Sequence, residues 1–355
     1  MFVARAGQAP LRGWRATRVP ARHPHTGIRL SWRGIRQTGR VNDFSTTNRI
    51  AVLGSANIDL VVRQPRLPQP GETIFGTGFS TVPGGKGLNQ AVAAARQGGA
   101  VDFMGAVGTD ANGIELHGVL ALHGIGARGL ADVEAPTGTA HIAVLDSGEN
   151  SIVVVSGANA TVTVLDADQE ATIEQARFLV MQCELPVSAL VAGIRVARAN
   201  GVFTVLTPAP VVPLPEGFLA SVDLVVPNQI EAAELTGEAD PVRAAELLSA
   251  DKTWAIVTLG AEGCVLAYDG AALGLAPARP VQAVDTTAAG DTFVGALVAR
   301  LAAFALPDQV AAADISEERM IDAVRWATVA SSISVTRAGA TSSMPDLAEV
   351  AAVLA

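Results

Sequence analysis

Short apolar runs alternate along the chain with longer Ala-rich stretches from about residue 49 onward. Six runs are apolar at consecutive positions and rich in β-branched residues, at 49–55, 101–108, 178–184, 202–208, 223–228 and 254–260. Apolar residues on both faces are typical of central strands that are covered by helices on both sides. Seven stretches have helical character, at 86–97, 111–123, 187–199, 228–236, 241–250, 290–304 and 317–335. This alternation predicts an α/β fold with a largely parallel central sheet.

Two segments depart from this rhythm. Residues 71–85 and 137–160 alternate between apolar and polar positions, and the second contains a turn signal at 146–150, DSGEN. Such segments predict hairpin strands with one face in water. Together with 57–63, they are expected to form a small antiparallel sheet over the main domain. Neither an internal repeat nor a linker divides the chain, which predicts one domain over 48–355 with lid strands at about 57–63, 71–83 and 137–156.

Residues 1–47 differ in composition from the rest of the chain. They contain nine arginines, no lysine and a single acid, Asp43. Without an apolar period, this segment is expected to be a disordered extension. Arg-rich, acid-poor sequence is typical of an organellar transit segment. A start assigned too far upstream is the simpler explanation, because only two of the chain's 25 basic residues are lysines, as GC-rich coding would produce.

The charge balance limits the classes of partner. The formal net charge is −9 and the pI is about 5.1, so no overall basic field attracts nucleic acid or anionic lipid. No uncharged apolar stretch approaches the ~18 residues needed to cross a bilayer. We therefore expect neither a nucleic-acid nor a membrane partner. The two cysteines, Cys183 and Cys264, suit a reducing compartment, which favours a cytoplasmic protein.

Polar residues follow the first apolar run. Asn57 and Asp59 are two positions apart and so lie on the same side of an extended chain. Ligands bind open α/β sheets at the carboxyl ends of the strands. The pair is therefore a candidate binding site, although a turn-forming Asn beside a solvated Asp would look the same.

A Gly-rich stretch, PGGKGLNQAVAAA, precedes the first strongly helical run. Its free amides and the Lys86 ammonium would lie at a helix N-terminus, which suits an anion or a hydroxyl-rich ligand. The stretch is not a P-loop, because Gly87 follows Lys86, and Gln90 stands where a dinucleotide motif requires its third glycine. A plain Gly-rich turn is the alternative.

Three further sites carry candidate chemistry. Glu184 closes a very apolar run, which indicates a carboxylate that faces a cleft or pairs with a cation. Asn228 and Glu231 have the spacing of a capping box, which is compatible with ligand binding as well. Residues 258–263, TLGAEG, offer a hydroxyl and glycine amides to phosphate oxygens, or form a hairpin turn.

The stretch DTTAAGD, residues 285–291, precedes another helical run. Gly290 allows an unusual backbone conformation there, and the amides of 288–291 would form an anion hole that contains the carboxylate of Asp291. A helix cap alone requires no Ala-Ala-Gly, whereas close approach of a phosphoryl group does. Such a carboxylate can accept a proton from a hydroxyl that attacks a γ-phosphate, while the amides and Mg²⁺ stabilise the transferring oxygens.

Taken together, these motifs resemble the PfkB family of carbohydrate kinases, and within it the members that phosphorylate ribose. The likeness covers about residues 49–345 and rests on GSANID, PGETIFG, GGKGLNQAVAAARQGG, VMQCELP, PNQIEAAELTG, TLGAEG and VQAVDTTAAGDTFVGAL. It implies a three-layer α/β sandwich with a central, mostly parallel sheet and a small β-sheet lid, which often makes a homodimer. It also implies ATP-dependent phosphorylation of the 5-hydroxyl of D-ribose. A relative acting on a nucleoside, fructose or deoxyribose is the alternative.

The resemblance also implies residue roles. A sugar site would contain Asn57, Asp59, Gly85, Lys86, Gly87, Asn89, Glu184 and Asp291. ATP contacts would come from Asn228, Thr258, Leu259, Gly260, Ala261, Glu262, Gly263, Gly290, Asp291 and Thr328. The catalytic group would consist of the base Asp291 with the anion hole of Ala288, Ala289 and Gly290, and Glu231 would help to order Mg²⁺. An activating K⁺ would be bound by Asp285 with oxygens of Thr287, Ser334, Arg337, Gly339 and Ser343.

Overall fold

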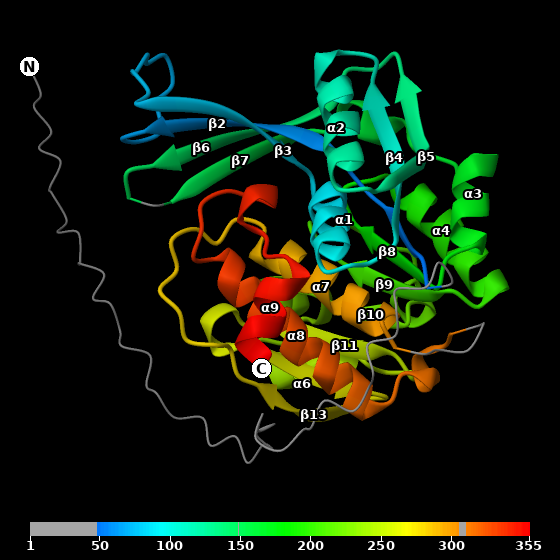
Figure 1. Ribbon diagram of the computed structural model, residues 1–355. Coiled ribbons are helices and arrows are strands. Elements are labelled where there is room, and N and C mark those ends of the chain that lie inside the picture. The colour runs from blue at the N-terminus through cyan, green and yellow to red at the C-terminus, as the bar shows by residue number, and fades with distance from the viewer. Residues whose placement is uncertain (1–47, 148, 305–309) are drawn as a thin grey trace, which may run out of the picture.

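The computed structural model describes residues 48–147, 149–304 and 310–355 (Figure 1). The Arg-rich extension predicted for 1–47 lies outside the described residues. A nine-stranded sheet forms the centre, in the order β13-β12-β11-β10-β9-β8-β1-β4-β5. Its parallel strands are β1 (Ile50–Leu53), β4 (Val101–Gly108), β5 (Gly126–Val133), β8 (Phe178–Gln182), β9 (Phe203–Thr207), β10 (Leu224–Val225) and β11 (Trp254–Thr258). The antiparallel pair β12 (Cys264–Tyr268) and β13 (Ala271–Ala276) completes one edge.

All six predicted central strands are present, which confirms the α/β assignment. The strand β5 was not predicted, because its sequence GARGLADV mixes glycines and charges and contains no apolar run. It lies at the edge of the sheet, where most of its residues are only partly buried or exposed.

The helices cover the two faces of this sheet (Figure 1). Their bounds are α1 (Lys86–Arg96), α2 (Ala111–Leu122), α3 (Ala167–Glu174), α4 (Val187–Asn200), α5 (Gln229–Thr236), α6 (Pro241–Leu248), α7 (Ala289–Ala302), α8 (Glu317–Ser334) and α9 (Leu347–Leu354). The seven predicted helices are all present. The helices α3 and α9 are additional, and each is only eight residues long.

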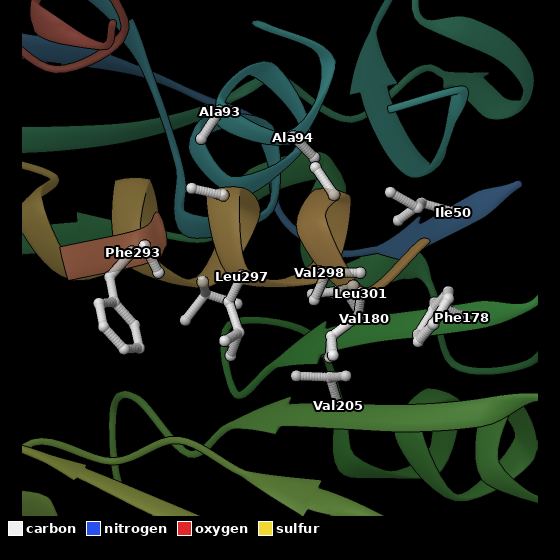
Figure 2. Close-up of a cluster of buried hydrophobic side chains, with 14 of the residues drawn as sticks. Ile50, Ala93, Ala94, Phe178, Val180, Val205, Phe293, Leu297, Val298 and Leu301 are labelled. Atoms are coloured by element: carbon white, nitrogen blue, oxygen red, sulfur yellow. The ribbon is translucent and has the colours of Figure 1, made fainter. Parts of the chain in front are cut away.

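Alternate residues of the central strands enter different cores, because successive side chains of a strand point to opposite faces. In β1, Ile50 and Val52 join the core under α1, α7 and α8, whereas Ala51 and Leu53 join the core under α4. Figure 2 shows the first core, in which side chains of α7 lie between those of α1 and those of β8 and β9.

The lid is a separate four-stranded sheet in the order β3-β2-β6-β7 that extends away from the main domain (Figure 1). Its strands are β2 (Asn57–Gln64), β3 (Gly78–Gly84), β6 (Gly138–Leu145) and β7 (Asn150–Val155). The prediction of an antiparallel sheet is wrong for one pair, since β2 runs parallel to β6. The chain passes through β3, α1, β4, α2 and β5 between these strands, and this long crossover permits parallel pairing. The strand expected from residue 71 begins only at Gly78.

Within the described ranges, no helix is both long and apolar enough to cross a membrane.

Candidate active site

Asp291 lies at the junction of the lid and the carboxyl ends of the central strands, in the first turn of α7. Its side chain is buried and accepts two hydrogen bonds from α1. Asn89 Nδ2 donates to Oδ2 at 3.1 Å, and Gln90 Nε2 donates to Oδ1 at 3.0 Å. Each carboxylate oxygen therefore has one neutral donor and retains a further lone pair for a ligand.

Close packing of α1 against α7 brings these groups together. A Cβ at Gly295 would lie 2.5 Å from the Gln90 carbonyl oxygen and 2.5 Å from Ala93 Cβ. Only glycine allows the two backbones to approach this closely. The side chains of Asn89 and Gln90 can consequently reach a residue about 200 positions later in the chain.

The backbone ahead of α7 differs from expectation in one respect. The unusual conformation predicted at Gly290 is found at Ala288, which has φ 55° and ψ 18° and is the N-cap, while Gly290 lies inside the helix. The position beside Gly290 is open, because a Cβ added to this residue would meet no atom within 4 Å. The Ala289 N–H donates to Thr286 O at 3.2 Å. The N–H groups of Gly290 and Asp291 have no partner among the described residues, so they are open to an anion.

Glu184 lies at the lid side of the same site. Its Oε2 accepts hydrogen bonds from the Ser55 hydroxyl at 2.5 Å and from the Lys86 backbone N–H at 3.0 Å. The loop after β1 and the start of α1 thus fix one carboxylate oxygen. Oε1 can then accept a hydroxyl of a ligand.

Asn57 and Asp59 lie at the start of β2, the first strand of the lid along the chain. Asn159 Nδ2 donates to Asn57 Oδ1 at 2.8 Å, and its own Oδ1 accepts the Ala56 N–H at 3.0 Å. The Asn57 amide therefore has its Nδ2 available as a donor. The carboxylate of Asp59 packs against Gly84, where any Cβ would clash with it.

The site is rich in carboxylates. Burial, with the nearby charges of Glu184 and Asp291, raises the pKa of Asp59 to about 7. Burial by itself lowers the pKa of Lys86, but the negative charges of Asp291, Glu184 and Glu231 raise this pKa above its ordinary value. The Lys86 ammonium thus faces several acids, and the site favours hydroxyl donors and an additional cation.

The loops predicted to bind nucleotide meet at the ends of β10 and β11. Asn228 caps α5 in a full capping box, with the Asn228 N–H donating to Glu231 Oε2 at 2.7 Å, and it bridges to Thr258. Residues 258–263 form the turn between β11 and β12, closed by the Leu259 N–H on Gly263 O at 2.7 Å. Burial raises the pKa of Glu231 above its ordinary value despite this capping bond and the charge of Lys86.

Thr328 is half-buried on α8, where its hydroxyl donates to the Val324 carbonyl at 2.8 Å. The structure thus gives it a bond within its own helix.

The two loops of the expected K⁺ site are joined. Backbone N–H groups of Val284 and Asp285 donate to Val335 O, and Asp285 accepts hydrogen bonds from both Thr287 and Gly339. The other expected ligands are nearby in the same loop. The Ser343 hydroxyl donates to Ala340 O, the Arg337 N–H donates to Ser334 O, and the Arg337 guanidinium pairs with Glu349.

Residues 47–347 of this chain match the sequence model of the family described as "pfkB family carbohydrate kinase". The chain belongs to the pfkB family. Within that family, it is 39% identical to the ribokinase of Haemophilus influenzae over 305 residues, which cover 83% of this chain and 95% of that protein. It is 38% identical to the ribokinase of Schizosaccharomyces pombe, with 85% and 96% covered.

Solved structures of pfkB-like kinases agree with this fold. The ribokinase of Arabidopsis thaliana complexed with ribose and ATP has a TM-score of 0.76 and 30% identity, and the match covers 87% of this chain and 99% of that one. A fructokinase from Xylella fastidiosa with bound ATP has a TM-score of 0.71 at 25% identity, covering 87% and 98%. The chain is therefore more similar to this ribokinase than to this fructokinase, in both sequence identity and TM-score.

Several polar residues of this pfkB-family site were not singled out from the sequence. All four are buried. Ser55, Gln90 and Asn159 each bond to a candidate site residue, and Gln182 bonds to Gln90. A lone amide within an apolar strand, such as Gln182, is a usable signal, because burying an amide has a cost in free energy. Asn159 gives no local signal, since its partners are about 100 residues away.

Proposed function

We propose that the protein transfers the γ-phosphoryl group of ATP to the 5-hydroxyl of D-ribose. The observation that carries this proposal is the placement of Asp291: a buried carboxylate beside open N–H groups at the start of α7, facing a site rich in groups that bind hydroxyls. The similarity to ribokinases, one of which was solved with ribose and ATP, supports ribose as the acceptor.

In the proposed reaction, Asp291 takes the proton of the 5-hydroxyl as that oxygen attacks the γ-phosphorus. A new O–P bond forms, the bond from the γ-phosphorus to the bridging oxygen breaks, and ADP leaves. The N–H groups of Gly290 and Asp291 would donate to the phosphoryl oxygens and stabilise their charge.

The sugar would be bound between lid and core. Asn89 supports this, because its Oδ1 is buried and has no partner among the described residues, so it is available to a hydroxyl. Asn57, Asp59, Gly85, Lys86, Gly87 and Glu184 would supply the other contacts. ATP would lie along Asn228 and the 258–263 turn, with Thr328 near the adenine ring.

Magnesium fits this site as a companion of ATP. Mg²⁺ keeps several waters and takes one or two carboxylates together with substrate phosphates. Glu231 can provide such a carboxylate, and within the described residues no group of three or more His, Cys, Asp or Glu side chains forms a metal site independent of ATP. When bound, Mg²⁺ would neutralise phosphate charge. We place K⁺ at the loops of Asp285, Thr287 and Ser334 to Ser343, where a carboxylate and main-chain oxygens suit a large cation.

We also infer a homodimer through the lid. Ile152, Val153, Val154 and Val155 of β7 are all exposed, a run of apolar surface that a second lid would cover. Two free, buried cysteines support a cytoplasmic location.

The test is a substrate panel with the full chain, ATP and Mg²⁺. Ribose, deoxyribose, fructose and adenosine are compared by kcat/KM, each in K⁺ and in Na⁺. We expect ribose to be turned over fastest and K⁺ to activate. Faster turnover of adenosine or fructose would refute ribose as the substrate and leave a kinase of the same family.

A further inference from the structure

Gln90 and Gln182 form a buried chain of amide groups that ends on Asp291. Gln182 Nε2 donates to Gln90 Oε1 at 2.7 Å, and Gln90 Nε2 donates to Asp291 Oδ1 at 3.0 Å. Gln182 is 0% exposed and Gln90 is 1% exposed. These bonds connect three elements, because Gln182 ends β8, Gln90 belongs to α1 and Asp291 lies in the first turn of α7.

The direction of this chain is fixed at one end. An ionised carboxylate only accepts hydrogen bonds, so Gln90 must turn its NH₂ group toward Asp291 and its carbonyl toward Gln182. Gln182 must then donate. Thr207 Oγ1, at the end of β9, accepts from the same Gln90 Nε2 at 3.3 Å and holds it from the other side.

Packing alone does not explain Gln182. Its Oε1 is buried without a partner among the described residues, and a Cβ at Gly54 would clash with that oxygen. A buried unpaired amide oxygen is unfavourable, whereas an apolar residue such as the neighbouring Met181 would avoid the cost. The fold thus keeps an amide here at the expense of stability.

We propose that Gln90 and Gln182 are positioning residues for the base: Gln90 orients the Asp291 carboxylate, and Gln182 fixes which side of the Gln90 amide faces it. The inference rests on the proposed role of Asp291. Neutral donors stabilise the ionised carboxylate without adding a cation, and they occupy one lone pair while another stays free for the sugar hydroxyl.

Other charges act on Asp291 from the surrounding elements. They are Lys86 of α1, Asp59 of β2 and Glu231 of α5, and Glu184 after β8 acts on Asp59 and Lys86. All of these groups are unchanged, and no charge is added, when Gln90 or Gln182 is replaced by Met. A shift in the titration of Asp291 would therefore report on the amides.

The kinetic test uses Gln90→Met, Gln182→Met and Gln182→Glu in the full chain. We expect Gln90→Met to lower kcat for ribose about 10- to 100-fold, as for loss of a hydrogen bond to a charged group, with a much smaller change in KM. The acidic limb of the pH profile should move up by about one unit, because the ionised base loses a donor. Gln182→Glu should do the same, since its carboxylate would attract the Gln90 NH₂ and turn the carbonyl toward Asp291.

A double variant separates positioning from packing. Gln182→Met should have almost no further effect on kcat in the Gln90→Met background, because Gln182 acts through Gln90. Fully additive effects would overturn the proposal.

Gln97→Met is the matched control. Gln97 is 3% exposed, at the other end of α1, and its amide donates to Pro345 O at 2.8 Å and accepts from Trp326 Nε1 at 2.9 Å. Its replacement should lower the thermal stability and leave the pH profile unchanged. A pH shift equal to that of Gln90→Met would overturn the proposal.

A direct titration keeps this inference separate from the proposed function. The ¹³C carboxyl signal of Asp291, assigned by its loss in Asp291→Asn, should titrate at higher pH in Gln90→Met than in the wild type. That shift would support the positioning role even if ribose were not phosphorylated. The opposite outcome is a wild-type enzyme that phosphorylates ribose and a Gln90→Met variant whose carboxyl titration and pH profile superimpose on those of the wild type. That outcome would overturn the inference and leave the proposed function intact.

Discussion

The Gly339 backbone N–H donates to Asp285 Oδ2 at 2.8 Å and so ties the loop ahead of α7 to the loop after α8. The other carboxylate oxygen accepts from the Thr287 N–H at 2.9 Å and from its hydroxyl at 2.6 Å. Burial would raise the pKa of Asp285, but these hydrogen bonds lower it below its ordinary value. The ionised Asp285 side chain thus connects two loops, and the proposed anion hole begins three residues beyond it.

Replacing Asp285 by Ala should remove activation by K⁺. Without the carboxylate, the loops lose both the tie and the negative charge that a large cation requires, so the ratio of kcat in K⁺ to kcat in Na⁺ should fall to about 1. Turnover in Na⁺ measures the remaining activity. Glu216→Ala, at an exposed position, is the control. Undiminished K⁺ activation in Asp285→Ala would contradict the site.

Replacing Asp291 by Asn should abolish turnover while ribose still binds. The amide keeps the size of the side chain but cannot accept the proton, and a general base contributes about 10²–10⁴-fold to the rate. Steady-state kinetics and ribose calorimetry measure the two effects separately. Turnover within about tenfold of the wild type would refute the role of Asp291 as base.

The raised pKa of Asp59, about 7, predicts a pH dependence of stability. Between the ordinary value of 3.8 and about 7, the folded state binds this proton more tightly than the unfolded state does. The free energy of unfolding should therefore fall as the pH rises through this window. Asp59→Asn removes this contribution, so the Tm of the variant relative to the wild type should be higher at pH 8 than at pH 5.

Asp110→Asn is the control for this experiment. Hydrogen bonds from Thr137 and Gly113 lower the pKa of Asp110. The contribution of this carboxylate to the free energy of unfolding is therefore already complete at pH 5. Its loss should lower Tm equally at both pH values. An equal Tm difference at pH 5 and pH 8 for Asp59→Asn would contradict the assignment.

Gly295→Ala should separate α1 from α7. The added Cβ would lie 2.5 Å from the Gln90 carbonyl oxygen, so one backbone must move. Overpacking of this kind typically costs about 1–3 kcal/mol, and kcat should fall as well because Gln90 leaves Asp291. Gly118→Ala on α2 is the matched control, since its Cβ would meet no atom within 4 Å, and we expect a gain of about 0.4–1 kcal/mol. Thermal unfolding and kinetics of both variants measure these effects, and an active, stable Gly295→Ala enzyme would disprove the close approach.

Val153→Lys should dissociate the proposed dimer. Val153 is 64% exposed on β7 in the isolated chain, and a charge buried between two lids would be costly. Light scattering after size exclusion should then give the mass of one chain. Ile114→Lys, an exposed position on α2, should leave the mass unchanged. A wild-type protein that is itself monomeric would exclude the lid dimer.

The sequence by itself determined the main elements and the local chemistry. Apolar runs such as residues 178–184 predicted the central strands, since burial on both faces leaves a continuous signal in composition. The capping box of Asn228 and Glu231 was also readable, because its partners are three residues apart. The motif residues could be named for the same reason: each motif is a short continuous stretch.

Only the tertiary structure decided which distant residues meet. No local pattern shows that Gln90 bonds to Asp291, because that contact depends on how closely α1 approaches α7 at Gly295. Likewise, β2 runs parallel to β6 because of the path of the chain between them. The left-handed residue ahead of α7 is Ala288, although glycine favours that conformation. Propensity and periodicity describe how each segment is buried, whereas packing and long-range hydrogen bonds determine the site.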